Sequence, residues 1–142
     1  MNKIERINLL SYVKLGDCEC QVLGLSFKDK VYKKKMLVEI CAINSFISSW
    51  HNIDDIEPIE LTDEWLKKLG FEIEKIHPGK QARKGNLCLW KGDGWANYAF
   101  MISNDQDIMD DENNFSVDLI FVHQIQNLYQ VLTEQELVLN EP

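Results

Sequence analysis

The 142-residue sequence has little of what marks several common protein classes. It holds four cysteines, seven glycines and three prolines, too few for a disulfide-stapled secreted scaffold or a flexible linker protein. The hydrophobic content of 45% is too high for a disordered chain. No apolar run approaches the roughly 20 residues of a membrane span. The N-terminus is charged, so we expect no signal peptide and a cytoplasmic protein.

Arginine is also scarce, and acidic residues outnumber basic ones. The chain has a net charge of −8 and only two arginines, and residues 101–142 carry nine acidic residues but no Lys or Arg. Duplex DNA binding depends on neutralising phosphates, and arginine makes the commonest base contact, so this composition disfavours sequence-specific DNA recognition. The charge asymmetry indicates either general solubility or an interaction surface of one sign.

No metal or cofactor site is expected. The cysteines form one close pair and two distant singles, whereas structural zinc sites usually use two close pairs; they are Cys18, Cys20, Cys41 and Cys88. The acidic run after Asp105 lacks the calcium-loop pattern, because Asp110 stands where Gly is required and Ser116 where Glu is required. Glycine-rich phosphate signatures are absent as well. We therefore expect reduced cysteines and an acidic surface loop over 103–114.

The pattern of apolar residues predicts an α+β fold in a single domain, 1–142. Apolar runs at 18–27 and 36–43, joined by a polar connection at 28–35, indicate an antiparallel β meander. Such a meander forms a small barrel-like or strongly bent sheet. A capping Thr62, acidic first-turn residues and Gly70 predict a short central helix over 62–69.

The second half of the chain is expected to add more strands and a C-terminal helix packed on the sheet. A basic loop is predicted at 75–84, around a Pro-Gly pair. Helical periodicity begins at Val122 and continues to Leu132. The predicted strands cover 86–90, 95–102 and 115–121.

One face of the C-terminal helix is unusual, because residues 119–133 contain no formal charge. The helix face opposite the apolar stripe carries only amides and a histidine: His123, Gln126, Asn127 and Gln130. Amides tolerate burial when they find hydrogen-bond partners. This face therefore packs within the molecule, contacts a protein partner or a second copy, or lines a ligand site. His123 has no nucleophile or carboxylate at a telling spacing, so we predict no catalytic residue and no enzyme.

Two basic segments, 28–35 and 75–84, provide an alternative. Lys33, Lys34 and Lys35 would contact a single strand of nucleic acid together with Arg83 and Lys84. Solvated loops are the simpler interpretation. The four tryptophans could mark a binding patch, but tryptophan is more often core; they are Trp50, Trp65, Trp90 and Trp95.

Two segments carry a resemblance. Residues 57–71, EPIELTDEWLKKLGF, resemble a "PIxLTxEWLxxxGF" stretch, and residues 122–137, VHQIQNLYQVLTEQEL, resemble a "VHQLQNLYxxLTGEEL" ending. Both motifs belong to a family of small uncharacterised proteins of Bacteroidota, their phages and mobile elements. Ile125 replaces the usual Leu, and the pair Glu134-Gln135 stands where Gly-Glu is usual. The resemblance implies a mobile-element setting and no reaction.

The sequence thus predicts a non-catalytic accessory or interaction protein of phage or mobile-element origin. Its partner would be another protein or a second copy, with no membrane involved. The alternatives are a single-stranded nucleic-acid-binding module and a protein that sequesters a small ligand, for which the sequence offers no pocket signature.

Overall fold

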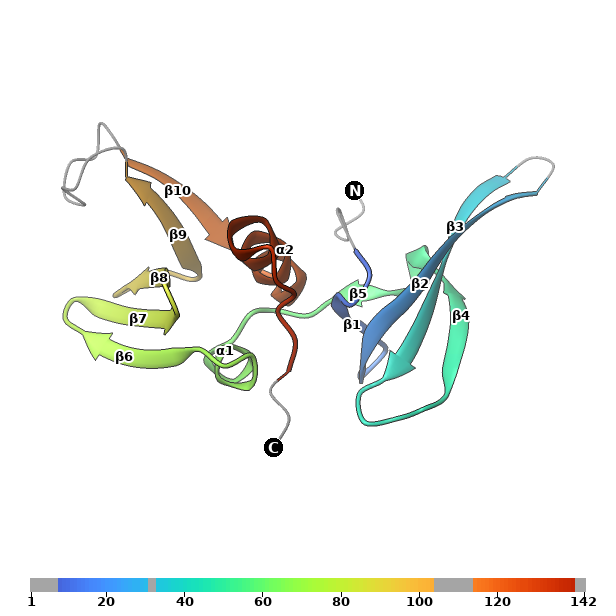
Figure 1. Cartoon of the computed structure of the whole chain (residues 1–142), viewed down its shortest axis with the longest axis horizontal. Coiled ribbons are helices and arrows are strands. Elements are labelled where there is room, and N and C mark those ends of the chain that lie inside the picture. The colour runs from blue at the N-terminus through green and yellow to red at the C-terminus, as the bar shows by residue number, and fades with distance from the viewer. Residues whose placement is uncertain (1–7, 31–32, 104–113, 140–142) are drawn as a thin grey trace. The chain divides into compact units, whose positions relative to one another are not determined.

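A computed structural model describes residues 8–30, 33–103 and 114–139. Their contacts divide the chain into two compact units. The first unit comprises Met1–Glu60 and Phe121–Glu136, and the second comprises Leu61–Ile120 and Leu137–Pro142. Each unit holds one five-stranded antiparallel sheet (Figure 1). Two compact units can still unfold together, so the single domain stays a prediction.

The sheet of the first unit is a meander whose last strand returns beside its first strand. The strand order is β4-β3-β2-β1-β5. The predicted pairing of the first two apolar runs is confirmed, because β2 pairs antiparallel with β3. The elements are β1 (Tyr12–Leu15), β2 (Cys18–Lys30), β3 (Lys33–Ala42), β4 (Ser48–Asn52), the 3-10 helix η1 (Ile53–Asp55) and β5 (Glu57–Pro58).

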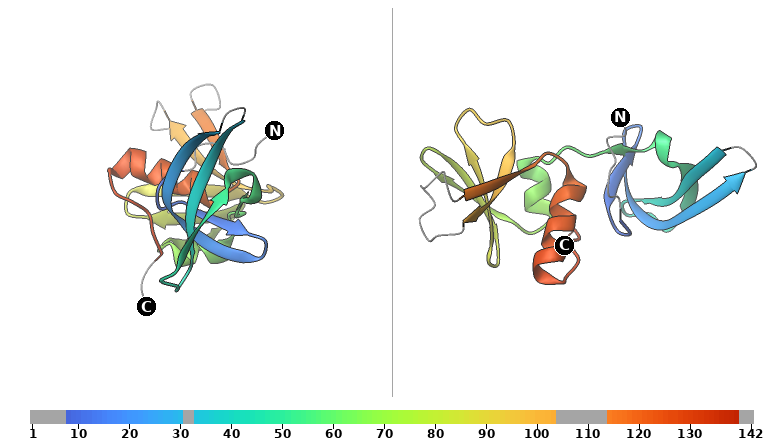
Figure 2. Two further views of the ribbon diagram at one scale, coloured as in Figure 1. Left: turned by 90° about the vertical axis from the view of Figure 1, so that its right-hand side faces the viewer. Right: turned by 90° about the horizontal axis from the view of Figure 1, so that it is seen from above.

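The core of the first unit lies on one face of this sheet. Alternate residues of the strands face inward, as the period of two in a strand requires. A bulge between Val22 and Gly24 shifts the register of β2 against β3, and β2 curves along its length (Figure 2). The buried cluster consists of Val13, Cys20, Val22, Val38, Ile40 and Ile56.

The second unit begins with the predicted central helix. Thr62 Oγ1 accepts a hydrogen bond from the backbone N of Trp65 at 3.2 Å, and Gly70 ends the helix with a φ of 93°. A β meander follows with the strand order β10-β9-β8-β7-β6. The elements are α1 (Asp63–Lys68), β6 (Glu72–Ile76), β7 (Gly79–Lys84), β8 (Leu87–Gly92), β9 (Tyr98–Ser103) and β10 (Asn114–Leu119).

Several expectations are corrected here. Both described sheets are open, so the barrel-like alternative is wrong and the antiparallel α+β fold is confirmed. The basic segments are hairpins, because β2 runs to Lys30, β3 starts at Lys33 and the β6–β7 hairpin covers most of 75–84. These strands continue into charged residues, whose side chains still alternate between the two faces of the sheet. A search for apolar residues alone does not detect them. The predicted acidic loop lies almost entirely outside the described residues.

The second unit is an insertion into the first. The chain leaves the first unit after Glu60 and returns at Phe121, and these two residues form an isolated antiparallel bridge. The returning helix α2 (Val122–Thr133) belongs to the first unit. Adjacent ends of this kind are what allow one unit to be inserted into another. In the described residues no helix is long and apolar enough to cross a membrane.

Candidate functional site

The predicted amide face of α2 is largely internal to the first unit. Gln126 is buried, and its Oε1 accepts a hydrogen bond from the backbone N of Tyr12 at 2.8 Å. Its Nε2 donates to the carbonyl O of Leu10 at 2.9 Å. These bonds attach the helix to the start of β1. Of the three alternatives for this helix face, Gln126 therefore follows the first, which is packing within the molecule.

The other members of the amide face differ in exposure. His123 is buried and stacks on Phe121, with ring centroids 5.9 Å apart. Asn127 Oδ1 accepts a hydrogen bond from Asn8 Nδ2 at 2.8 Å, whereas Gln130 is exposed. The structure therefore does not bring the four side chains together as one accessible surface. Whether Gln130 contacts a partner stays a prediction.

The basic residues also divide between the two units. Lys33, Lys34 and Lys35 lie in β3, but their side chains are outside the described residues. Arg83 is exposed on β7. Lys84 donates from Nζ to the carbonyl O of Leu69 at 2.8 Å, and burial lowers the pKa of this amine. Lys84 is thus engaged within the second unit, and a nucleic-acid site stays a prediction for the rest.

Among the described residues, the two most exposed large apolar side chains and a half-exposed tryptophan lie close together around the β3–β4 connection of the first unit. Phe46 is 104% exposed, Ile47 is 81% exposed and Trp50 is 49% exposed. Leaving a Phe or Ile side chain in water forgoes about 1.5–3 kcal/mol of burial free energy. Scattered single residues are ordinary, but three in five positions form a patch typical of a contact surface. We call Phe46, Ile47 and Trp50 the apolar tip.

The backbone of the apolar tip is held in a defined conformation. Ser45 N donates to the carbonyl O of Ala42 at 3.0 Å, and Ile47 N donates to Ser45 Oγ at 3.2 Å. The Cys41 thiol donates to the Ser45 carbonyl O at 2.9 Å. Asn44 adopts a φ of 69°, a left-handed conformation that Asn tolerates in turns. The exposed side chains are therefore presented by an ordered turn.

Trp50 lies across the outer face of the first sheet. The register places Trp50, Glu39 and Gly24 on three neighbouring strands. A Cβ on Gly24 would lie 3.1 Å from Cη2 of Trp50, so the absence of a side chain there makes room for the indole ring. Glu39 Oε2 accepts a hydrogen bond from Ser48 Oγ at 2.9 Å. These contacts fix the ring while leaving half of it exposed.

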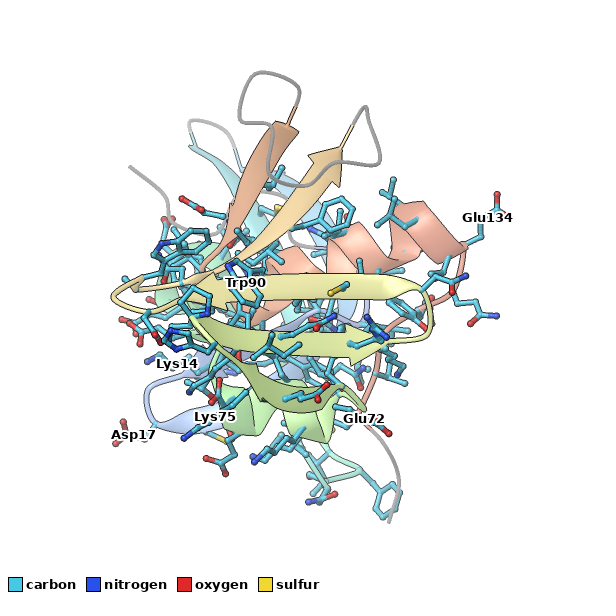
Figure 3. The ribbon with its side chains drawn as sticks, turned by 90° about the vertical axis from the view of Figure 1, so that its left-hand side faces the viewer. Lys14, Asp17, Glu72, Lys75, Trp90 and Glu134 are labelled. Atoms are coloured by element: carbon cyan, nitrogen blue, oxygen red, sulfur yellow. The ribbon has the colours of Figure 1, made fainter. Side chains whose placement is uncertain are left out.

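The strand that carries Trp50 is also a sheet edge. β4 is the terminal strand of its sheet, and its sequence, Ser-Ser-Trp-His-Asn, has no Lys, Arg, Asp, Glu or Pro. The other three edges have such residues: β5 has Glu57 and Pro58, β10 has Asp118, and Glu72 and Lys75 stand on β6 (Figure 3). Charge and proline protect edges from pairing with other chains. β4 is the edge without that protection.

A serine and a histidine lie within hydrogen-bond distance on β4. Ser49 Oγ and His51 Nε2 are 2.7 Å apart. Nucleophilic catalysis also needs a group that orients the histidine and donors for the oxyanion. In the described part of the chain, no carboxylate hydrogen-bonds to His51. We interpret the pair as a polar contact on an exposed strand.

The second unit contains a polar clamp. Asp63 Oδ2 accepts from Lys80 Nζ at 2.8 Å, and Asp63 Oδ1 accepts from the Tyr98 hydroxyl at 2.8 Å. Partial burial alone would raise the pKa of Asp63, but these two hydrogen bonds outweigh it and hold the pKa below its usual range. Burial and the Asp63 carboxylate raise the pKa of Tyr98. The clamp joins α1 to β7 and β9.

An open pocket of about 310 Å³ lies on the second unit. Its lining comprises Trp95, Ala96, Asn97, Ala99 and Asp118. Trp95 and Trp50 are each nearly half exposed, whereas Trp65 is buried. The expectation that tryptophan is mostly core therefore fails for these two residues, and the sequence held no signal that separated them. No group of three or more metal-ligating side chains occurs in residues 8–30, 33–103 and 114–139.

No protein-family model, curated protein or solved structure matches the chain. The resemblance of residues 57–71 and 122–137 to the Bacteroidota family therefore stays a prediction.

Proposed function

We propose that this chain is a non-catalytic interaction protein that binds another protein strand at the edge of β4. The observation that carries the proposal is the coincidence of an edge without charge or proline and an exposed apolar tip. Strand addition uses backbone hydrogen bonds for affinity and neighbouring side-chain contacts for specificity. Phe46, Ile47 and Trp50 would supply those contacts.

This contact surface differs from the one expected from the sequence. Gln126 already uses both ends of its amide within the first unit. The interaction role is retained, but its surface moves from α2 to β4. The phage or mobile-element setting remains part of the proposal only through the sequence resemblance.

Photo-crosslinking tests the proposal directly. A benzophenone amino acid in place of Phe46 should form one dominant protein adduct in a Bacteroidota lysate. The adduct should disappear when His51→Lys places a charge on the β4 edge. The control carries the same group at Val131, which is 78% exposed on α2 of the same unit. Equal adducts at both positions, or an adduct that His51→Lys leaves intact, would contradict the proposal.

A second candidate is small-ligand binding, which the pocket beside Trp95 favours. Its volume is at the lower end of the range typical of ligand sites. Native mass spectrometry of gently purified protein should then show an added mass that Trp95→Ala removes. A purified chain with no added mass, which also gains none after incubation with the small-molecule fraction of a lysate, would exclude this candidate.

A further inference from the structure

The residues of β4 are arranged almost symmetrically about Trp50. In both directions from Trp50, the strand presents two uncharged polar residues: Ser49 and Ser48 on one side, His51 and Asn52 on the other. An antiparallel pair of identical strands is related by a two-fold axis, and each residue then meets its counterpart across that axis. The sequence of β4 suits such a pairing.

We propose that β4 pairs antiparallel with β4 of a second copy of this chain, with the two-fold axis at Trp50. This inference rests on the proposed function and names its partner. Across the pair, Ser48 would face Asn52 of the second copy, and Ser49 would face its His51. Within one copy, Ser48 Oγ donates to Glu39, Ser49 Oγ contacts His51 Nε2 and Asn52 Oδ1 accepts from Asp54 N. The facing pairs would therefore use the groups that remain, which are the serine hydroxyl lone pairs, the Asn52 side-chain amide N–H groups and the second ring nitrogen of His51.

The charges around the edge are compatible with a second copy. The whole chain carries a net charge of −8, so most approaches of two copies bring like charges together. β4 has no Asp or Glu, and Asp54 and Asp55 lie beyond its end in η1. Centring the pair on Trp50 places the acidic residues of the two copies at opposite ends of the paired segment. The pairing therefore avoids direct like-charge contacts.

The apolar tip extends the contact beyond the paired strands. Ile47 precedes β4 and Ile53 follows it, at equal distances from Trp50 in the sequence. Antiparallel pairing brings Ile47 of one copy toward Ile53 of the other, because the strands run in opposite directions. The Trp50 side chains of the two copies lie on the same face at the axis, where aromatic side chains can pair. Exposed apolar surface would thus be covered in the dimer.

Cysteine cross-linking tests both the partner and the register. The background is Cys18→Ser with Cys41→Ser, which removes the exposed thiol and the thiol beside Ser48 while a hydroxyl remains at position 41 to donate to the Ser45 carbonyl O. Trp50→Cys places two cysteines opposite each other at about 4.5–5.5 Å between Cα atoms, within disulfide range. Ser48→Cys is the matched control, because its two copies would be offset by four residues, or about 14 Å along the strands.

Mild oxidation should convert the Trp50→Cys chain to a covalent dimer and leave the Ser48→Cys chain monomeric. The wild-type chain should show a mass that rises toward two copies with concentration. Equal cross-linking at both positions, or a wild-type chain that is monomeric at every concentration, would overturn the dimer. If a different protein is cross-linked at Phe46 in a His51-dependent way, the proposed function stands and only the dimer falls. If nothing is cross-linked at either position or at Phe46, both fall.

Discussion

The side-chain amide of Gln126 is hydrogen-bonded to the backbone N of Tyr12, 114 residues earlier in the chain. The same amide donates to the carbonyl O of Leu10. A single glutamine thus joins the returning helix α2 to the first strand of its unit. Gln126, which lies on the uncharged helix face, is therefore used for an internal contact.

Removing this amide should destabilise the first unit. Gln126→Ala deprives the Tyr12 N–H of its acceptor, whereas the Leu10 carbonyl keeps a bond from Gln21 Nε2 at 3.3 Å. We expect a loss of about 2 kcal/mol in the free energy of unfolding, because buried polar groups that lose a partner cost about 1–3 kcal/mol each. Urea unfolding measures it. Gln130→Ala, at an exposed position of the same helix, should change stability by less than about 0.5 kcal/mol; equal losses would refute the assignment.

Gly24 should tolerate no larger residue while Trp50 is present. A Cβ there would lie 3.0 Å from Glu39 Oε1 and 3.1 Å from Trp50 Cη2. Gly24→Val should destabilise the protein by about 1–3 kcal/mol, the usual range for overpacking. In a Trp50→Ala background the same substitution should cost less, since the ring is gone. A double-mutant cycle on thermal unfolding measures the coupling, and strictly additive effects would show that the ring does not occupy this space.

The Asp63 clamp should make the protein sensitive to acid. Because the folded pKa of Asp63 lies below its ordinary value of 3.8, the stabilisation is present above that pH and disappears as the pH falls through the folded pKa. Asp63→Asn should flatten the decline in stability below about pH 4. Glu64→Gln is the control. Glu64 follows Asp63 in the sequence, and among the described ion pairs it contacts only Lys68, at 3.7 Å. An unchanged acid profile for Asp63→Asn would contradict the clamp.

The cysteines should differ in reactivity. Burial, followed by the neighbouring Cys18 thiol, raises the pKa of Cys20 to about 11, and the thiolate is the reactive form. Alkylation at pH 8 should therefore modify exposed Cys18 well before Cys20. Peptide mass mapping of a time course measures the order. Modification of Cys20 first in the folded protein would show that its surroundings are not those described.

Local signals in the sequence predicted what depends on local structure. Thr62 and Gly70 define the ends of α1 within one residue of the expected helix, and the period of the apolar residues defined α2. β1, β4, β5, β6 and β7 were missed, because strands of two to six residues with few apolar side chains carry too few alternations to stand out. The open sheets depend on which edges pair, and that is not a local property.

The candidate surface was harder to predict than the fold. The partner of Gln126 is determined by packing between segments 114 residues apart. Likewise, the residues next to Trp50 and Trp95 do not predict that these side chains are exposed while Trp65 is buried. Gly24 and Gly92 leave room for each indole to lie against a strand, and for Gly24 this contact depends on strand pairing rather than on sequence proximity. The absence of charge on β4 was readable in the sequence, but only the strand order shows that β4 is an edge.

Amide hydrogen exchange at the edge of β4 tests most directly whether this edge is an interface. The purified chain is exchanged at low and high protein concentration, and the amides of Ser48–Asn52 are compared with those of the β6 edge. We predict that β4 becomes protected as the concentration rises, because its free backbone groups pair with a second strand, while β6 does not change. Exchange of β4 that is independent of concentration, in a chain that remains monomeric, would contradict the paired edge.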